Sequence, residues 1–406
     1  MTATLDDTSL REKISAVVAS IAATAVDRDR NRELPYDLVR ELAVSGFGAL
    51  RVPSEFGGYG LSFPELTELV LDLAAADSNV VQLLRTHFIF TEGLIHAAES
   101  DDRTAWLRRI ADGGIFGGAY TEQNAQNQTH FSTRISTDAS GRRTVTGKKF
   151  YSTGSLYADW ILTTGEGKHT VEQAVVPAGA EGVTLVDDWH GFGQKLTASG
   201  TTVFEEVDIT DTPQLPHDVA LGSYGTSVAQ FWHLIALAGI SRAAHADAVD
   251  YVRSRTRFFS QGAGVLPRED SLIQTVIGEV SAANHLAETL VRHSARTLDA
   301  HSRAIRSGAS SSALEDATEI EIYRAQVTVI ETVLKAVTRL FDVGGASALS
   351  VEKGWDRHWR NARTLSNHNP VHLKARSLGE RALLGNDLPE IWYVGTGRIA
   401  AEKVTR

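Results

Sequence analysis

One long helical stripe constrains this chain more than any other feature. Apolar residues recur at alternating spacings of three and four between positions 320 and 341, namely Ile320, Tyr323, Val327, Ile330, Leu334, Val337 and Phe341. A stripe that continues for six turns predicts a helix with one face buried in a bundle. Gly344 and Gly345 follow in "DVGG", and glycines at such places commonly end helices.

The rest of the 406-residue chain divides by composition. Residues 10 to about 112 repeat apolar positions at helical spacing. From 113 to about 210 the chain is rich in Thr, Val and Gly, and its strand candidates are "RISTDASGRRTVTG", read as two strands, "WILTTG", "QAVVPA" and "TTVFEEVDI". The prolines of "TDTPQLPHD" then predict a linker.

We therefore expect an α+β fold that is mainly α. An N-terminal helical domain would span 1–112, a β domain 113–215, and a C-terminal helical bundle 216–406. A chain of this length is sufficient for two to three domains.

Charge and hydropathy exclude several function classes. The formal net charge is -10 and no basic stripe stands out, so we expect no nucleic-acid partner. The most apolar window, "FWHLIALAGI", is too short to span a bilayer. The chain has no cysteine and no signal-like apolar segment at its start, which favours a cytoplasmic protein.

Common catalytic motifs are absent from the sequence. It contains no dinucleotide fingerprint, no P-loop and no GxSxG motif. His368 and His372 have the spacing of metal ligands on a helix, but Pro370 lies between them and the other ligands of an HExxH site are missing. We therefore predict no metal site.

Five short motifs appear in order along the chain, "VPSEFGGYG", "GGAYTEQNAQN", "GKKFYSTGSLYADW", "RSRTRFF" and "LFDVGGASAL". Together they resemble the acyl-CoA dehydrogenase fold. That fold has N-terminal helices, a middle β-barrel or sandwich domain and a C-terminal four-helix bundle. The resemblance implies a flavin between the β domain and the bundle, completed by neighbouring subunits of a homotetramer.

The resemblance also implies which residues contact the flavin. Thr121 would donate to the pyrimidine ring, where reduction places negative charge, and the Thr153 hydroxyl would face the central-ring nitrogen. Both threonines could instead simply line strands. Arg257 suits the flavin phosphate, with Arg253 and Arg255 as alternatives. The full implied set is Tyr120, Thr121, Asn127, Tyr151, Ser152, Thr153, Trp189, Arg257, Gly344, Gly345 and Lys374.

Two departures argue against dehydrogenase chemistry. Dehydrogenases of this family abstract a proton with a glutamate in a tetrapeptide that aligns with His368 to Val371, and Asn369 holds the glutamate position here. Some relatives keep the glutamate on the first bundle helix, but the matching "VAQFW" has no carboxylate. An amide cannot act as a general base, so α,β-desaturation is disfavoured.

The stretch "GWDRHWRNARTLSNHNPVHLKAR" resembles the flavin monooxygenases built on this fold, of the dibenzothiophene and sulfur-acquisition types. These enzymes take reduced FMN from a separate reductase and form a flavin hydroperoxide with oxygen. The resemblance implies His368, His87 and Thr153 as catalytic residues. His87 could instead be a core histidine, and Trp189 an ordinary core residue of the β domain.

The sequence thus favours a two-component, reduced-FMN-dependent monooxygenase that oxygenates a small organosulfur or aromatic compound. Two alternatives stay open, an acyl-CoA dehydrogenase that uses FAD and a flavin-free scaffold. Ser347 and Thr91 stand where the dibenzothiophene type has arginine and tyrosine. These differences favour the sulfur-acquisition type.

Overall fold

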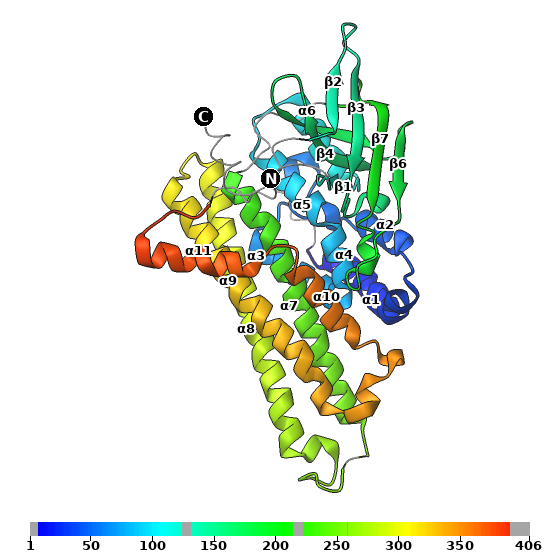
Figure 1. Ribbon diagram of the computed structural model, residues 1–406, viewed down its shortest axis with the longest axis vertical. Helices are drawn as coiled ribbons and strands as arrows, with labels where there is room; N and C mark the ends of the chain where they lie inside the picture. The colour runs from blue at the N-terminus through cyan, green and yellow to red at the C-terminus, as the bar shows by residue number, and fades with distance from the viewer. Residues whose placement is uncertain (1–6, 124–130, 214–221, 258, 390–406) are drawn as a thin grey trace.

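The computed structural model describes residues 7–123, 131–213, 222–257 and 259–389. Its N-terminal part is helical, as predicted, and packs beside the upper half of the bundle (Figure 1). Ser62 begins the third helix with a capping box, in which its side chain and that of Glu65 satisfy each other's backbone N–H groups. The N-terminal helices are α1 (Asp7–Asn31), α2 (Tyr36–Val44), α3 (Phe63–Ala76), α4 (Ser78–Leu83), α5 (Arg85–His96) and α6 (Asp101–Ala111).

The middle part, predicted as a barrel or sandwich, contains one seven-stranded sheet that forms a half-barrel. The order is β1-β4-β2-β3-β7-β6, and β5 pairs with the other edge of β4. All the strands predicted from composition are confirmed. The strands are β1 (Phe116–Ala119), β2 (Arg134–Thr137), β3 (Arg143–Lys149), β4 (Trp160–Glu166), β5 (Val171–Pro177), β6 (Val183–Val186) and β7 (Thr201–Asp208).

Three long helices form most of the C-terminal bundle. They are α7 (Gly222–Ser254), α8 (Ser271–Arg306) and α9 (Ser312–Arg339). The helix predicted from the apolar stripe is confirmed as α9, although its α-helical part ends at Arg339 and a 3-10 segment, Leu340–Val343, leads to Gly344. The buried face includes Tyr323, Ile330 and Val337 from the stripe.

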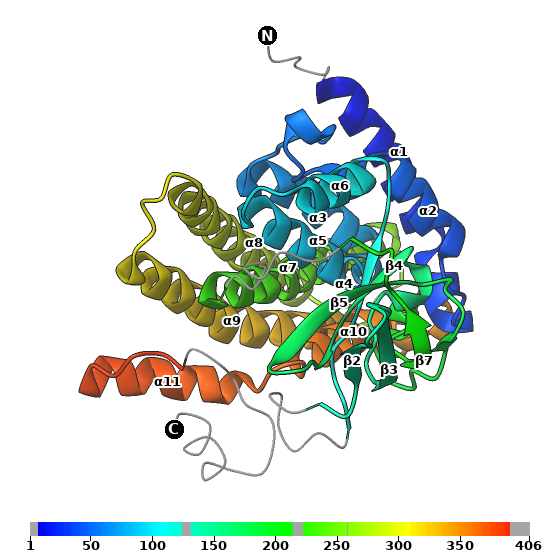
Figure 2. The same cartoon turned by 90° about the horizontal axis from the view of Figure 1, so that it is seen from above.

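The fourth helix of the bundle is broken into α10 (Asp356–Ser366) and α11 (Val371–Leu384). The break contains His368 and Pro370, as the sequence predicts. Pro370 stands at the N-cap of α11, where its missing N–H costs no helical hydrogen bond. Figure 2 shows α11 reaching outward beyond α9.

The N-terminal helices and the bundle share one hydrophobic core. Its buried members come from both parts, and Phe88 of α5 stacks on Trp232 of α7 with ring centroids 4.3 Å apart. Our proposed boundary at 112/113 lies between α6 and β1. The boundary at 215/216 and most of the predicted linker lie outside the described residues.

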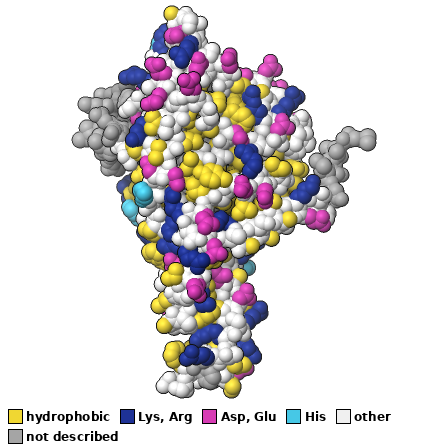
Figure 3. Space-filling view, turned by 90° about the vertical axis from the view of Figure 1, so that its right-hand side faces the viewer, with side chains coloured by type: hydrophobic (Ala, Val, Ile, Leu, Met, Phe, Trp, Pro, Cys, Tyr) yellow, Lys and Arg dark blue, Asp and Glu magenta, His cyan; other side chains and the backbone are white. Residues whose placement is uncertain are grey.

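On the face seen in Figure 3, acidic and basic side chains are interspersed around an apolar area. Within the described residues, no helix has the length and apolarity needed to cross a membrane. The same residues include no group of three or more acidic, histidine or cysteine side chains placed to hold a metal ion.

Candidate active site

Helix α7 carries polar residues that contact the break between α10 and α11. Asn369 in the break donates from Nδ2 to Oε1 of Gln230, 2.8 Å away. One turn further along α7, the ring of His233 lies 4.3 Å from that of His368, centroid to centroid. The tertiary fold therefore brings the predicted catalytic histidine against a second imidazole that no sequence motif singles out.

His368 favours its neutral form. Surrounding protein atoms displace water and lower the pKa of His368, and the positive charges of Arg85 and Lys374 lower it further, while Asn369 opposes them through a hydrogen bond. The residue nevertheless keeps exposed surface. A neutral imidazole that solvent-sized molecules can reach is able either to accept or to donate a proton.

The expected flavin-contacting residues of the β domain lie together. Thr121 forms a bridge with Phe150, and the N–H of Gly118 donates to the Thr153 carbonyl over 3.2 Å. The Thr153 hydroxyl lies 2.7 Å from that of Ser199. Two segments separated by some thirty residues therefore run next to each other, with Thr121 opposite Phe150 and Thr153 opposite Gly118.

Two observations at this place point to a ligand. The Ser152 hydroxyl is buried and has no hydrogen-bond partner within the described structure. Tyr151 has a φ of 56°, a left-handed conformation that costs free energy in a residue with a side chain. Orphaned buried hydroxyls and backbone strain both gather at binding sites.

Lys149 and Glu122 support these strands, and the sequence analysis missed both. The buried Lys149 ammonium donates to Oε1 of Glu122 over 2.8 Å and to the Tyr120 carbonyl over 3.2 Å. Glu122 also accepts the N–H groups of Ser132 and Thr133. These bonds hold the Tyr120–Glu122 segment against β3. The two adjacent lysines of "GKKF" were the available signal, because successive side chains of a strand point to opposite faces, so one of the two must turn inward and find a partner.

The residues "WRN" in α10 attach the broken helix to the β domain. Arg360 pairs with the buried Asp29 and donates to the Phe192 carbonyl. Asn361 accepts the Gln194 N–H over 2.6 Å. This docking holds the α10 end of the His368 turn, which explains the arginine and the asparagine without any contact to a ligand.

Trp189 lies in the same loop and is half-buried. Its Nε1–H donates to the Gln194 carbonyl over 2.9 Å, and its ring meets that of Tyr151 edge to face at 6.2 Å. Trp189 therefore adjoins the expected flavin strands, and it also has the loop contacts of an ordinary structural residue.

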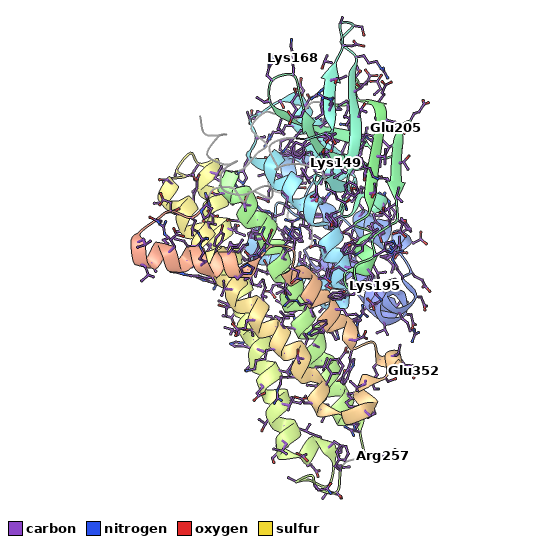
Figure 4. The ribbon with its side chains drawn as sticks, viewed as in Figure 1. Lys149, Lys168, Lys195, Glu205, Arg257 and Glu352 are labelled. Atoms are coloured by element: carbon purple, nitrogen blue, oxygen red, sulfur yellow. The ribbon has the colours of Figure 1, made fainter. Side chains whose placement is uncertain are left out.

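The expected phosphate-binding residues lie elsewhere. Figure 4 shows Arg257 at the far tip of the bundle, at the opposite end from Lys149 in the sheet. Phe259 adjoins Gly345 at that tip, and Arg255 donates to the Val343 carbonyl over 3.0 Å. One copy of the chain therefore does not bring Arg257, Gly344 and Gly345 to Thr121 and Thr153.

Two residues have surroundings that differ from the expected ones. His87 is fully buried, its Nε2 hydrogen bonds to the Gly48 carbonyl and its Nδ1 accepts the Phe116 N–H. Burial lowers the pKa of His87 to about 4. Since backbone groups occupy both ring nitrogens, this geometry favours the core-histidine alternative.

Lys374 requires a similar correction. Its ammonium points into the bundle, where it donates to Oε1 of Gln326 and lies 5.1 Å from the centroid of the Tyr323 ring. Only 3% of the residue is exposed, so a flavin phosphate cannot be its contact in this conformation. Asn127, another expected contact, lies outside the described residues.

The donors present fit a flavin between the β domain and the bundle. Thr121, Ser152 and Thr153 offer hydroxyl groups on the sheet side, Tyr151 and Trp189 offer aromatic faces, and His368 stands on the bundle side. N-terminal helices, a middle sheet and a C-terminal helical bundle, with a flavin between the sheet and the bundle, make up the architecture of acyl-CoA dehydrogenases.

Family comparisons agree with that class. The family model of the acyl-CoA dehydrogenase N-terminal domain matches residues 4–114, and the family model of the acyl-CoA dehydrogenase C-terminal domain matches residues 231–372. Together these matches cover more than half of the chain. The chain belongs to the acyl-CoA dehydrogenase family.

Its curated relatives include monooxygenases of the family. The chain is 26% identical over 374 residues to a probable FMNH2-dependent monooxygenase, SfnC, of Pseudomonas putida, and the match covers 90% of this chain and 93% of that protein. It is 27% identical over 380 residues to dibenzothiophene monooxygenase of Rhodococcus erythropolis, covering 89% and 90%. The predicted resemblance to these two types is confirmed.

Solved structures give the same result. Methanesulfinate monooxygenase MsuC of Pseudomonas fluorescens superposes with a TM-score of 0.85 and 26% identity, covering 94% of this chain and 98% of that one. FMN-bound TdsC of Paenibacillus sp. A11-2 superposes with a TM-score of 0.86 and 23% identity, covering 94% and 99%. The second likeness concerns the fold alone.

Proposed function

We propose that the chain is a two-component monooxygenase that uses reduced FMN and oxygen to oxygenate a small organosulfur or aromatic compound. The observation that carries the proposal is the Asn369–Gln230 hydrogen bond beside His368. Asn369 takes the place of the dehydrogenase glutamate, and Gln230 belongs to the α7 stretch where other relatives keep theirs. Two amides that bond to each other cannot abstract a proton.

Names and folds of relatives support the same chemistry. SfnC is named as FMNH2-dependent, TdsC was solved with FMN, and MsuC is named for methanesulfinate. When bound and reduced, FMN would supply the two electrons that let one oxygen atom enter the substrate and the other leave as water. The electrons would come from a separate flavin reductase.

The chain's own residues have separable roles in this proposal. Thr121, Ser152 and Thr153 would hold the flavin by hydrogen bonds, and Tyr151 with Trp189 would cover it. His368 would take or give the proton at the reacting oxygen, and its lowered pKa keeps the resting imidazole uncharged. Arg360 and Asn361 would act indirectly, by docking the His368 turn onto the β domain.

We also propose that the protein assembles as a homotetramer. Arg257, Gly344 and Gly345 stand at the distal tip of the bundle, so they could reach the flavin phosphate only in a neighbouring copy. In a symmetric assembly, the distal tip of one chain's bundle would lie against the place in another chain where the β domain meets the bundle. The cysteine-free composition supports a cytoplasmic location, where a reductase would be at hand.

The direct test supplies purified protein with FMN, a flavin reductase, NADH and ¹⁸O₂. Sulfides, sulfones, sulfinates and indole serve as substrates, and mass spectrometry follows the products. We expect one ¹⁸O atom in the product of at least one substrate. Anaerobic bleaching of bound FAD by an acyl-CoA would instead establish a dehydrogenase, and absence of micromolar flavin binding would establish a flavin-free scaffold.

A further inference from the structure

A chain of hydrogen bonds crosses the interior of the bundle from α11 to α7. Lys374 of α11 donates from Nζ to Oε1 of Gln326 in α9. Nε2 of Gln326 donates to Oε1 of Gln230 in α7 over 2.8 Å. The same Oε1 accepts Nδ2 of Asn369, the residue that follows His368, over 2.8 Å. Lys374, Gln326 and Gln230 are exposed by only 3%, 4% and 7%, so this chain belongs to the protein interior.

The lysine gives this chain of hydrogen bonds one direction. Burial lowers the pKa of Lys374 to about 7 and the negative charge of Glu319 opposes that shift, so the ammonium form prevails at pH 6. An ammonium offers donors and no acceptor. Gln326 must therefore turn its oxygen towards Lys374 and its NH₂ group towards α7, where Gln230 meets it with its own oxygen. The buried cation thus selects one of the two orientations that each carboxamide could adopt.

The selected orientation leaves the NH₂ group of Gln230 free. No described residue accepts a hydrogen bond from Nε2 of Gln230. This nitrogen is also not one of the enclosed polar atoms without a partner, so solvent reaches it although most of the residue is buried. A buried side chain that directs its one free polar group outwards presents that group to whatever molecule occupies the adjoining space.

His233 shows that the same face of α7 lacks a partner at a second position. It follows Gln230 by three residues, which places the two side chains next to each other on the helix. Its Nε2 is enclosed and has no hydrogen-bond partner within the described residues, and its ring lies 4.3 Å from that of His368, centroid to centroid. Unsatisfied buried groups need an explanation, and a ligand supplies one. The free amide therefore stands beside the histidine to which we assign the proton of the reacting oxygen.

We propose that Gln230 donates a hydrogen bond to the oxygen atom that the reaction adds to the substrate, and that Lys374 is the positioning residue that turns the amide towards it. This inference rests on the proposed function, because the added oxygen defines the ligand. An oxygen newly attached to sulfur or to an aromatic ring carries negative charge, so an N–H that is fixed in advance stabilises the state in which that bond forms. Gln230 contacts the reacting atoms, whereas Lys374 acts only through Gln326 and Gln230.

The flavin is the other possible acceptor for this amide. The donors expected for its pyrimidine ring, Thr121 and the backbone beside it, lie in the β domain. Gln230 is bonded instead to the turn that carries His368, on the bundle side. This geometry favours the substrate oxygen, and titration of the variants below with FMN distinguishes the two acceptors.

Binding to the protein loaded with oxidised FMN tests the donor without turnover. Calorimetry at pH 6 compares a sulfoxide, which carries the acceptor oxygen, with the sulfide that lacks it. The two probe pairs are methyl phenyl sulfoxide with thioanisole, and tetramethylene sulfoxide with tetrahydrothiophene. We expect at least one sulfoxide to bind about 3- to 10-fold tighter than its sulfide, the size of one neutral hydrogen bond.

Gln230→Glu isolates the amide hydrogen. The carboxylate can still accept from Gln326 and Asn369 through Oε1, so both internal bonds are kept, while the group that faces the site changes from NH₂ to a charged oxygen. The ratio of sulfoxide affinity to sulfide affinity should fall by about tenfold or more, since two acceptors then face each other. Gln274→Glu, the same change at an exposed glutamine of α8, should leave the ratio unchanged.

Variants of Lys374 test the positioning role and provide a second readout if Gln230→Glu does not fold. Lys374→Arg keeps a side chain that can only donate, so it should keep most of the affinity ratio. Lys374→Gln can donate or accept and no longer selects one orientation, so the ratio should fall by about threefold or more. Lys335→Gln, at an exposed position of α9, is the control. A lysine with a merely structural role would weaken the binding of sulfoxide and sulfide alike.

Three results would overturn the proposal. They are equal or absent binding of sulfoxides and sulfides by the wild type, an unchanged affinity ratio in folded Gln230→Glu, or a loss in that variant that falls on FMN alone. An unchanged ratio in Lys374→Gln would overturn the positioning role of the lysine. Incorporation of ¹⁸O together with any of these results would leave the proposed function standing, whereas failure of the wild type to bind FMN would contradict the proposed function itself.

Discussion

Nδ2 of Asn369 lies 2.8 Å from Oε1 of Gln230, so a pair of amides joins the break before α11 to helix α7. Gln326 donates to the same Oε1 over 2.8 Å, and Lys374 donates to Oε1 of Gln326. Because an ammonium can only donate, Lys374 determines which way Gln326 faces, and Gln326 in turn determines the orientation of Gln230.

Asn369→Ala should disturb the turn more than the fold. Gln230 keeps its bond from Gln326, so the expected loss of unfolding free energy is about 1 kcal/mol. Since the His368 turn loses its tie to α7, oxygenation should fall while FMN affinity is kept. Kinetics with FMN titration check this, with the exposed Asn367→Ala as control. Equal losses in both variants would contradict a specific role of the amide pair.

His368→Ala should lower oxygenation by roughly 10²-fold or more, the usual size of a lost acid–base group. The fold and much of the FMN affinity should remain, because the proposed flavin donors lie mainly in the β domain. His372→Ala, an exposed histidine four residues later, is the matched control. Near-normal turnover by His368→Ala would show that His368 is not a catalytic residue.

Lys374→Met should change how stability depends on pH. Burial lowers the pKa of Lys374 to about 7, whereas an unfolded lysine titrates near 10.4. Between these values the unfolded chain holds a proton that the folded chain lacks. The lysine therefore makes the unfolding free energy rise with pH, by at most about 1.4 kcal/mol per pH unit.

Urea unfolding at several pH values between 6 and 10 measures this effect. As the pH rises through this range, the unfolding free energy of the wild type should increase relative to that of Lys374→Met, because the variant lacks the titrating group. The exposed Lys335→Met should keep the wild-type slope. Parallel profiles for wild type and Lys374→Met would mean that Lys374 titrates normally.

Glu92→Gln should destabilise the fold strongly. The buried Glu92 carboxylate pairs with Arg51 at 2.6 Å and accepts the Tyr224 hydroxyl at 3.1 Å. Leaving Arg51 unpaired costs about 3–5 kcal/mol. Thermal unfolding checks this, with the exposed Glu99→Gln as control.

The same carboxylate predicts acid sensitivity. Although burial opposes ionisation, Arg51 and His96 lower the pKa of Glu92 to about 2. Its contribution to stability should be full above about pH 4.5 and should disappear as the pH falls towards 2, because the unfolded glutamate is protonated first. A Glu92→Gln variant with wild-type acid sensitivity would contradict this origin.

Arg257→Gln should weaken FMN binding through a neighbouring copy. Thr153→Val should weaken it too, from the other side of the same site. If each site combines Thr153 of one chain with Arg257 of another, an equimolar refolded mixture should regain wild-type affinity in about a quarter of its sites. Flavin fluorescence titration measures that fraction, and a mixture with no recovered sites would mean that the two residues do not complete one site across chains.

The sequence by itself determined the elements and the location of the break. The apolar stripe specifies α9 because a period near 3.6 can be buried only as a helix. Short pieces rich in Thr and Val specify strands, and Pro370 breaks the fourth helix because it lacks an N–H. His368 could be selected from its place in that break together with the resemblance.

Only the tertiary structure decided which polar groups meet. Arg85 and Ala229 are 144 residues apart, yet they share a hydrogen bond, and His233 reads in the sequence as one more position in an apolar helix. The same packing enclosed His87 between backbone groups and turned Lys374 inward. A residue's local pattern shows whether it is in a helix or strand, whereas its chemistry depends on partners that distant segments bring to it.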